Sequence, residues 1–102
     1  MHPSIRNHRP ELAALCRRYG VSRLEIFGSA AKRSSGEDVG DFDFLVEFED
    51  RESGDYADAY FGLLEALENL LKKPVDLVIT SAIDNPYFLA DIARSRAVVY
   101  DA

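Results

Sequence analysis

Every second residue from Phe42 to Phe48 is apolar, and Asp41, Asp43, Leu45 and Glu47 occupy the alternate positions. Successive side chains of a strand point to opposite faces, so this pattern predicts a strand with one face in the core. The side chains expected on that core face are Phe42, Phe44, Val46 and Phe48. Three other short apolar runs predict three more strands, the last of them a small edge strand: residues 23–27, 75–79 and 97–100.

Three segments carry apolar residues three and four positions apart, the spacing that marks one face of a helix. The first, residues 10–19, begins with Pro10 and is followed by Gly20, which suits the start and the end of a helix. The second, residues 55–73, has a long apolar stripe, and residues 86–94 predict a last short helix. We expect the stripe in the core together with Phe61; its members are Tyr56, Tyr60, Leu63, Leu64, Leu67, Leu70 and Leu71.

The order helix, strand, polar loop, strand, helix, strand, helix predicts an α/β (α+β) fold in which helices cover a small mixed sheet. The chain has 102 residues, of which 47% are apolar, so we expect one packed domain over residues 1–102. The polar loop between the first two strands is long for so small a domain. Loops of this kind serve a ligand more often than a simple connection.

Charge and composition exclude several classes of protein. A net charge of −6 argues against a protein that coats a polynucleotide, since that affinity comes from Lys and Arg. The single cysteine, Cys16, is expected to be buried and inert. No apolar run approaches the ~20 residues of a membrane span, and the start of the chain lacks the apolar core of a signal peptide, so we expect a cytoplasmic protein without a membrane partner. His2 and His8 are expected at the surface, with no catalytic role.

Three aspartates lie within the apolar strands. Asp41 and Asp43 are two residues apart and therefore project to the same side, and a neighbouring strand can bring Asp76 against them. Like charges at close range disfavour the folded state unless a cation offsets them. Carboxylate oxygens without a nearby His or Cys favour Mg²⁺ or Mn²⁺, and Mg²⁺ commonly completes its shell with water and substrate phosphate. The pattern therefore predicts a divalent metal site for a phosphate-bearing substrate.

A Gly28-Ser29 pair ends the first strand. Glycine lets the backbone approach a ligand, and the amides of such a turn, with the serine hydroxyl, can donate to phosphate oxygens. Lys32 and Arg33 add positive charge nearby. Neither Gly-Ser nor Asp-x-Asp is specific alone, whereas the ordered combination of turn, loop, paired aspartates and a later aspartate is much more so.

This combination resembles the minimal nucleotidyltransferases of the DNA polymerase β-like superfamily, especially the short prokaryotic MNT-domain proteins that are paired with HEPN partners. The resemblance covers about residues 10–100, and three segments carry it: FGS at 27–29, DFDFLV at 41–46 and VDLV at 75–78. It implies a polymerase β-like nucleotidyltransferase fold and transfer of AMP from ATP to a hydroxyl. In several proteins of this kind the acceptor is a tyrosine of a HEPN toxin, which makes the MNT protein an adenylylating antitoxin.

The resemblance also implies the roles of particular residues. Asp41, Asp43 and Asp76 match the catalytic carboxylates that hold the metal, with two Mg²⁺ ions expected and Mn²⁺ as an alternative. The nucleotide-binding positions are Gly28, Ser29 and Lys32. The chain departs from the usual family pattern at Lys32, where arginine is common, and at Arg33, where glycine is common; Gly40 and Phe42 also differ. None of these changes removes a catalytic group.

Two other functions stay open at this point. The acceptor could be a small molecule, although relatives of that kind usually carry an additional helical domain. The protein could also be a catalytically idle antitoxin or adaptor that acts by binding, although a self-repelling carboxylate cluster serves no purpose there. The sequence decides neither the acceptor nor whether the protein forms a homo-oligomer.

Overall fold

A computed structural model describes residues 2–28, 40–49, 56–80 and 83–102 of the chain. Its helices and strands follow the predicted order, with one short helix added at the N-terminus. The elements are α1 (Pro3–Asn7), α2 (Arg9–Arg18), β1 (Val21–Phe27), β2 (Phe42–Phe48), α4 (Tyr56–Leu71), β3 (Val75–Ile79), α5 (Pro86–Ala93) and β4 (Ala97–Asp101). Helix α4 ends where Lys72 adopts a left-handed backbone conformation with φ of 59°.

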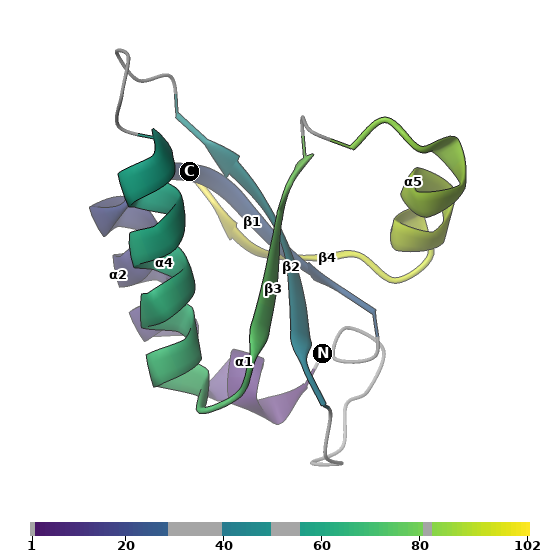
Figure 1. The fold of residues 1–102 in the computed structure, drawn as a ribbon. Helices are drawn as coiled ribbons and strands as arrows, with labels where there is room; N and C mark the ends of the chain where they lie inside the picture. Colours follow the sequence, from purple (N-terminus) through teal and green to yellow (C-terminus); the bar gives the residue numbers. More distant parts are fainter. Residues whose placement is uncertain (1, 29–39, 50–55, 81–82) are drawn as a thin grey trace.

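The strands form one mixed sheet in the order β3-β2-β1-β4 (Figure 1). Strand β1 pairs antiparallel with both β2 and β4, whereas β2 and β3 run parallel. The connection between the parallel strands includes α4, as parallel pairing requires. The mixed sheet and the edge position predicted for the last strand are thus confirmed.

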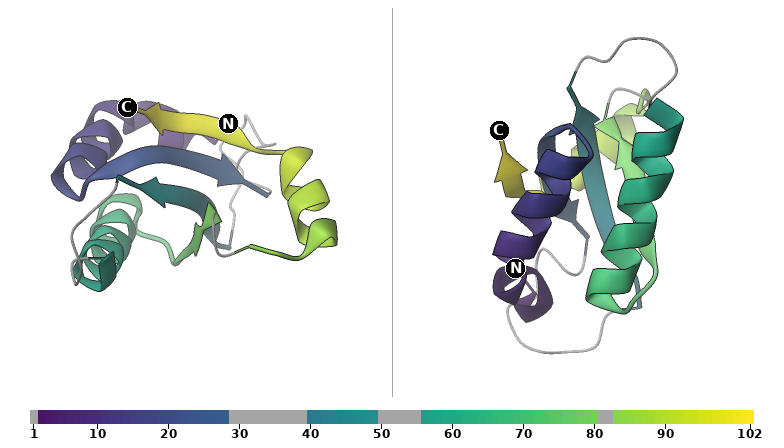
Figure 2. Two further views of the ribbon diagram at one scale, coloured as in Figure 1. Left: turned by 90° about the horizontal axis from the view of Figure 1, so that it is seen from above. Right: turned by 90° about the vertical axis from the view of Figure 1, so that its left-hand side faces the viewer.

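Helices α2 and α4 lie side by side against one face of the sheet, and α5 lies on the opposite side (Figure 2). The main core fills the space between α1, α2, α4 and the sheet. Phe42, Phe44 and Val46 of β2 are almost completely buried there, as their alternation predicts. Tyr60 of α4 also donates a hydrogen bond to the carbonyl oxygen of Leu77, which fixes this helix to β3.

The opposite face of the sheet has a second, smaller apolar cluster. Ile92 of α5 packs on Phe27 and Leu45, and all three side chains are buried. This packing explains why an apolar residue, Leu45, stands among the polar residues on this face of β2. Because α5 covers only part of this face, polar and charged side chains occupy other positions on it.

Two expectations about burial were wrong. His2 is only 8% exposed: its Nδ1 accepts a hydrogen bond from the amide of Ser4 at 3.1 Å, and its ring meets that of Phe42 edge to face. It caps α1, a helix too short to be recognised from periodicity. Phe61 is 64% exposed and Tyr56 is 43% exposed, because α4 buries only one stripe against the sheet. No helix in the described ranges has the length and apolar character needed to cross a membrane.

Candidate active site

The pairing of β2 with β3 decides where the aspartates lie. Asp43 and Asp76 are partners in the parallel register, so their side chains are neighbours on the face opposite the main core. Asp41 stands just before β2, two residues from Asp43, and is exposed. Asp76 is also exposed, whereas Asp43 is partly buried. Asp43 is thus a neighbour of both other aspartates, of Asp76 across the ladder and of Asp41 along the chain.

The electrostatics of Asp43 reflect this crowding. Burial raises the pKa of its carboxyl above the ordinary value of 3.8, and the negative charges of Asp76 and Asp41 raise it further. An ionised Asp43 is therefore held at a cost to the folded state. A cation bound beside it would remove that cost.

The donor set fits a hard cation but does not form a finished site. Within the described residues, no three His, Cys, Asp or Glu side chains lie in an arrangement that could hold a metal ion. Mg²⁺ usually takes one or two carboxylates and fills its octahedron with water and substrate phosphate. The adjacent Asp43 and Asp76, with Asp41 beside them, meet that requirement in chemistry without forming a closed cage.

Gly28 lies against Asp43 from the other side, since Phe27 pairs with Asp43 across β1 and β2. Its φ of +73° suits glycine, and a Cβ placed on it would stand 2.8 Å from Oδ2 of Asp43. The missing side chain therefore leaves room for the carboxylate. The amide of Gly28 donates to Oγ of Ser95 at 3.0 Å, so this amide is already engaged. Ser29 and Lys32, the other expected nucleotide-binding residues, lie outside the described residues.

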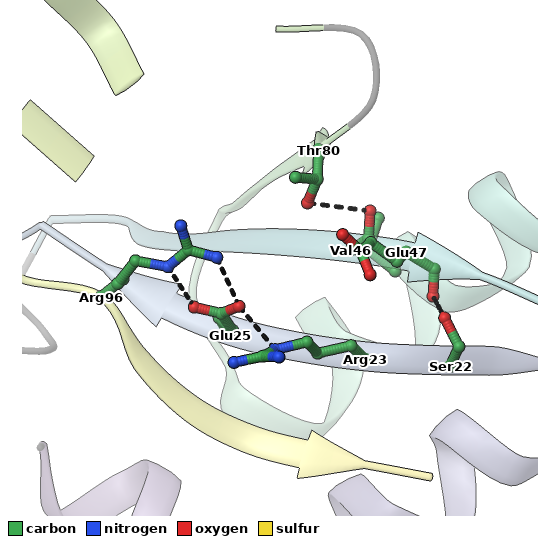
Figure 3. Close-up of polar contacts among 7 residues, drawn as sticks. All are labelled: Ser22, Arg23, Glu25, Val46, Glu47, Thr80 and Arg96. Carbon is green, nitrogen blue, oxygen red and sulfur yellow. Dashed lines mark hydrogen bonds and ion pairs between the residues drawn. The ribbon is translucent and has the colours of Figure 1, made fainter. Parts of the chain in front are cut away.

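An ion-pair cluster around a buried glutamate of the same sheet was not anticipated from the sequence (Figure 3). Glu25 of β1 is 3% exposed and accepts two hydrogen bonds from Arg96, from Nε at 2.6 Å and from Nη2 at 2.7 Å. Arg23 Nε forms an ion pair with the same carboxylate at 2.7 Å, without the angle of a hydrogen bond. The hydrogen bonds of Arg96 keep the pKa of Glu25 below its ordinary value, with both guanidinium charges acting in the same direction.

The sequence carried one signal of this cluster. Glu25 is a charged residue within the otherwise apolar end of β1, and a buried charge requires a partner. The partner, however, is 71 residues away and follows α5, so no spacing rule connects the two. Ser95, which is 67 residues from Gly28, escaped notice for the same reason.

Comparison with known proteins places this geometry in a family. A model described as "Nucleotidyltransferase domain" matches residues 12–99. A proposed protein adenylyltransferase of Methanocaldococcus jannaschii is 41% identical over 95 residues, which cover 93% of this chain and 90% of that protein. A second proposed protein adenylyltransferase of the same organism is 38% identical over 79 residues, covering 78% of this chain and 84% of that one.

The chain belongs to the nucleotidyltransferase family. A solved structure described as a proposed minimal nucleotidyltransferase has a TM-score of 0.71 at 33% identity, and the match covers 95% of each chain. The resemblance seen in the sequence, the fold and the class of enzyme are thereby confirmed.

More distant structures share the fold. One, with a TM-score of 0.64 at 17% identity, is described as a tri-AMPylated Shewanella oneidensis HEPN toxin in complex with an MNT antitoxin; the match covers 96% of this chain and 73% of that one. Another structure, described as a toxin-antitoxin with AMP-PNP, has a TM-score of 0.63 at 17% identity. That match covers 92% of this chain and 73% of the other chain. At these identities the likeness extends to the fold alone.

Proposed function

We propose that this nucleotidyltransferase transfers AMP from ATP, with a divalent metal, to a hydroxyl on a partner protein. The observation that carries the proposal is the position of Asp43, which has Asp76 as its partner in the register of β2 and β3 and Gly28 close to its carboxylate. Glycine admits the carboxylate at the end of β1, and the crowded charges favour a bound cation. Residues 1–102 would act as one nucleotidyltransferase domain.

Each carboxylate has a role in this proposal. Asp41 and Asp43 would hold Mg²⁺, with two ions expected, and Asp76 would complete the shell of one of them. Bound Mg²⁺ supplies positive charge that offsets the charge on the triphosphate and on the departing pyrophosphate. Asp76 would also accept the proton of the attacking hydroxyl. The hydroxyl of Ser29 and the ammonium of Lys32 would bind phosphate oxygens.

The position of Asp76 supports an acceptor from another molecule. This residue is exposed, and β3 is an edge strand of the sheet, so a hydroxyl carried by a second protein can approach it. The names of the two curated relatives, both proposed protein adenylyltransferases, point in the same direction. A HEPN protein is the partner class that we propose, with a tyrosine as acceptor, because one structure of the same fold is described as an AMPylated HEPN toxin in complex with an MNT antitoxin. In this role the protein would be a cytoplasmic antitoxin.

The test uses ATP labelled at the α-phosphate, Mg²⁺, the purified protein and a lysate of its source cell. Asp43→Asn removes the central carboxylate, and Asp91→Asn, an exposed aspartate of α5, is the matched control. We expect a labelled protein band with the wild type and with Asp91→Asn, and none with Asp43→Asn. Transfer that survives in Asp43→Asn would refute the assignment of the site.

Other outcomes separate the remaining functions. Metal-dependent ATP binding without protein labelling would leave two explanations, a small-molecule acceptor or a protein partner that is missing from the lysate. Absence of ATP binding would indicate an antitoxin that acts by binding alone.

A thermal melt adds a check that needs no acceptor. The folded-state pKa of Asp43 is raised, so its charge destabilises the metal-free protein at neutral pH. Asp43→Asn should therefore melt at the same or a higher temperature in EDTA, and Mg²⁺ should raise the Tm of the wild type and of Asp91→Asn but not that of Asp43→Asn.

A further inference from the structure

The segment that joins α5 to β4 holds the end of β1 at two points. Oγ of Ser95 accepts a hydrogen bond from the amide of Gly28 at 3.0 Å. The next residue, Arg96, forms its two hydrogen bonds with Glu25, three residues before Gly28. Two successive residues of one segment therefore contact the strand that leads into the candidate active site.

This segment is itself firmly anchored. The amides of Ser95 and Arg96 both donate to the carbonyl oxygen of Ile92, at 3.0 Å and 2.9 Å. Ile92 is 1% exposed and packs against Phe27, the residue before Gly28. The backbone of Ser95 is thus anchored to Ile92, a residue whose buried side chain packs against the same strand.

The hydrogen bond acts where the sheet no longer constrains the chain. Phe27 is the last residue of β1 that pairs with β2, and its partner is Asp43. Gly28 lies beyond that pair, with a positive φ, and its Cα faces the carboxylate of Asp43. The direction of its peptide plane therefore depends on the bond to Ser95. The amide of Gly28 already donates its hydrogen bond to Ser95. Its role in the site is therefore to hold the backbone in place.

We propose that Ser95 is a positioning residue for nucleotide transfer: through the amide of Gly28 it holds the turn against Asp43. The role rests on the proposed function, because it assigns the turn and Asp43 to the reaction. Ser95 touches neither the nucleotide nor the metal in this scheme. Its effect comes from keeping the backbone of Gly28 and the carboxylate of Asp43 in one relative position.

Three variants test this role. Ser95→Ala removes the acceptor, and Ser95→Thr retains a hydroxyl at the same position. Ser22→Ala is the matched control, because the Ser22 hydroxyl also makes one hydrogen bond within the sheet, to the carbonyl oxygen of Glu47 at 3.1 Å (Figure 3). Steady-state AMP transfer is measured well below the Tm of each variant, together with hydrogen exchange at the Gly28 amide by NMR.

We expect Ser95→Ala to lower kcat/KM for ATP about tenfold, the effect of one lost hydrogen bond at a site that must stay ordered. Exchange of the Gly28 amide should accelerate about tenfold in the same variant. Ser95→Thr should restore both values to within about twofold of the wild type, and Ser22→Ala should change neither. Equal losses in Ser95→Ala and Ser22→Ala would mean a general effect on stability and would overturn the role.

The two readouts keep this inference separate from the proposed function. If the wild type transfers AMP and Ser95→Ala transfers it equally well, the positioning role is wrong and the proposed function stands. If the wild type transfers nothing, the proposed function fails and so does a role in transfer, while Gly28 exchange still decides whether Ser95 holds the turn. Unchanged exchange in Ser95→Ala would overturn the inference whatever the activity.

Discussion

Replacing Gly28 by alanine perturbs the backbone and the catalytic carboxylate at the same time. Gly28 has a φ of +73°, and an added Cβ would lie 2.8 Å from Oδ2 of Asp43. Carbon and oxygen atoms that touch without bonding stand about 3.3 Å apart or more. The carboxylate of Asp43 would therefore have to retreat by about 0.5 Å, or the turn would have to shift by a similar distance.

The two effects have different magnitudes. A left-handed conformation costs about 1–2 kcal/mol in a residue with a Cβ. For a chain of about this length, that corresponds to a Tm lower by about 4–16 °C. The contact adds little to the loss of stability, because the end of a side chain can move aside. Activity is more sensitive, since catalytic groups must be held within about 0.5 Å and a 1 Å misplacement can cost 10²-fold. We expect kcat of Gly28→Ala to fall about tenfold to a hundredfold.

The assay measures AMP transfer from α-labelled ATP at a temperature where each variant is folded, with a thermal melt beside it. Gly40→Ala is the matched control, because among the described residues, its chain neighbours apart, no atom lies within 4 Å of a Cβ added at Gly40. This control should transfer AMP at close to the wild-type rate. If Gly28→Ala lost stability but kept its kcat, the position of the Asp43 carboxylate would not limit the reaction. If Gly40→Ala lost as much activity as Gly28→Ala, the effect would not come from the contact with Asp43.

Three further predictions follow from buried side chains. Glu25→Gln should lower the free energy of unfolding at pH 7 by about 2 kcal/mol, because it weakens a charge-assisted pair with Arg96. The pKa of Glu25 is lower in the folded than in the unfolded protein, so this stabilisation is complete at neutral pH. It is lost as the pH falls below the ordinary value of 4.5, and denaturant titrations of variant and wild type should converge there. Cys16 is fully buried, and burial raises the pKa of its thiol to about 12, so a thiol reagent at pH 8 should label it in denaturant but not in the native protein. Leu67→Ala should lower the free energy of unfolding by about 3 kcal/mol in a urea titration, because Leu67 is completely buried and its removal leaves a cavity; a loss below about 1 kcal/mol would mean that α4 does not pack as described.

Local pattern was sufficient for most of the secondary structure. The alternation along residues 41–48 identified β2 and its core face, because a strand repeats every two residues. The stripe of residues 55–73 identified α4 in the same way, although the helix stops at Leu71. Periodicity did not predict α1, because its five residues are too few to show a helical repeat. It also overstated the core, because Tyr56, a member of the stripe, is 43% exposed.

The pairing of strands was beyond the reach of local pattern. The sequence predicted that a neighbouring strand could bring Asp76 to the paired aspartates, but the order β3-β2-β1-β4 decides that this neighbour is β3. The parallel register then sets Asp43, rather than Asp41, beside Asp76. Strand order depends on how helices pack across the sheet, and a single sequence does not display that packing.

By itself, the sequence determined the chemical groups of this protein: the aspartates within apolar strands, the glycine that ends β1 and the rhythm of the core. These follow from residue type and spacing, which act over a few residues. Only the tertiary structure decided how distant groups meet. The bonds of Ser95 to Gly28 and of Arg96 to Glu25 join residues 67 and 71 positions apart. Such contacts form because buried polar groups must find partners, and the folded chain alone determines which partners lie within reach.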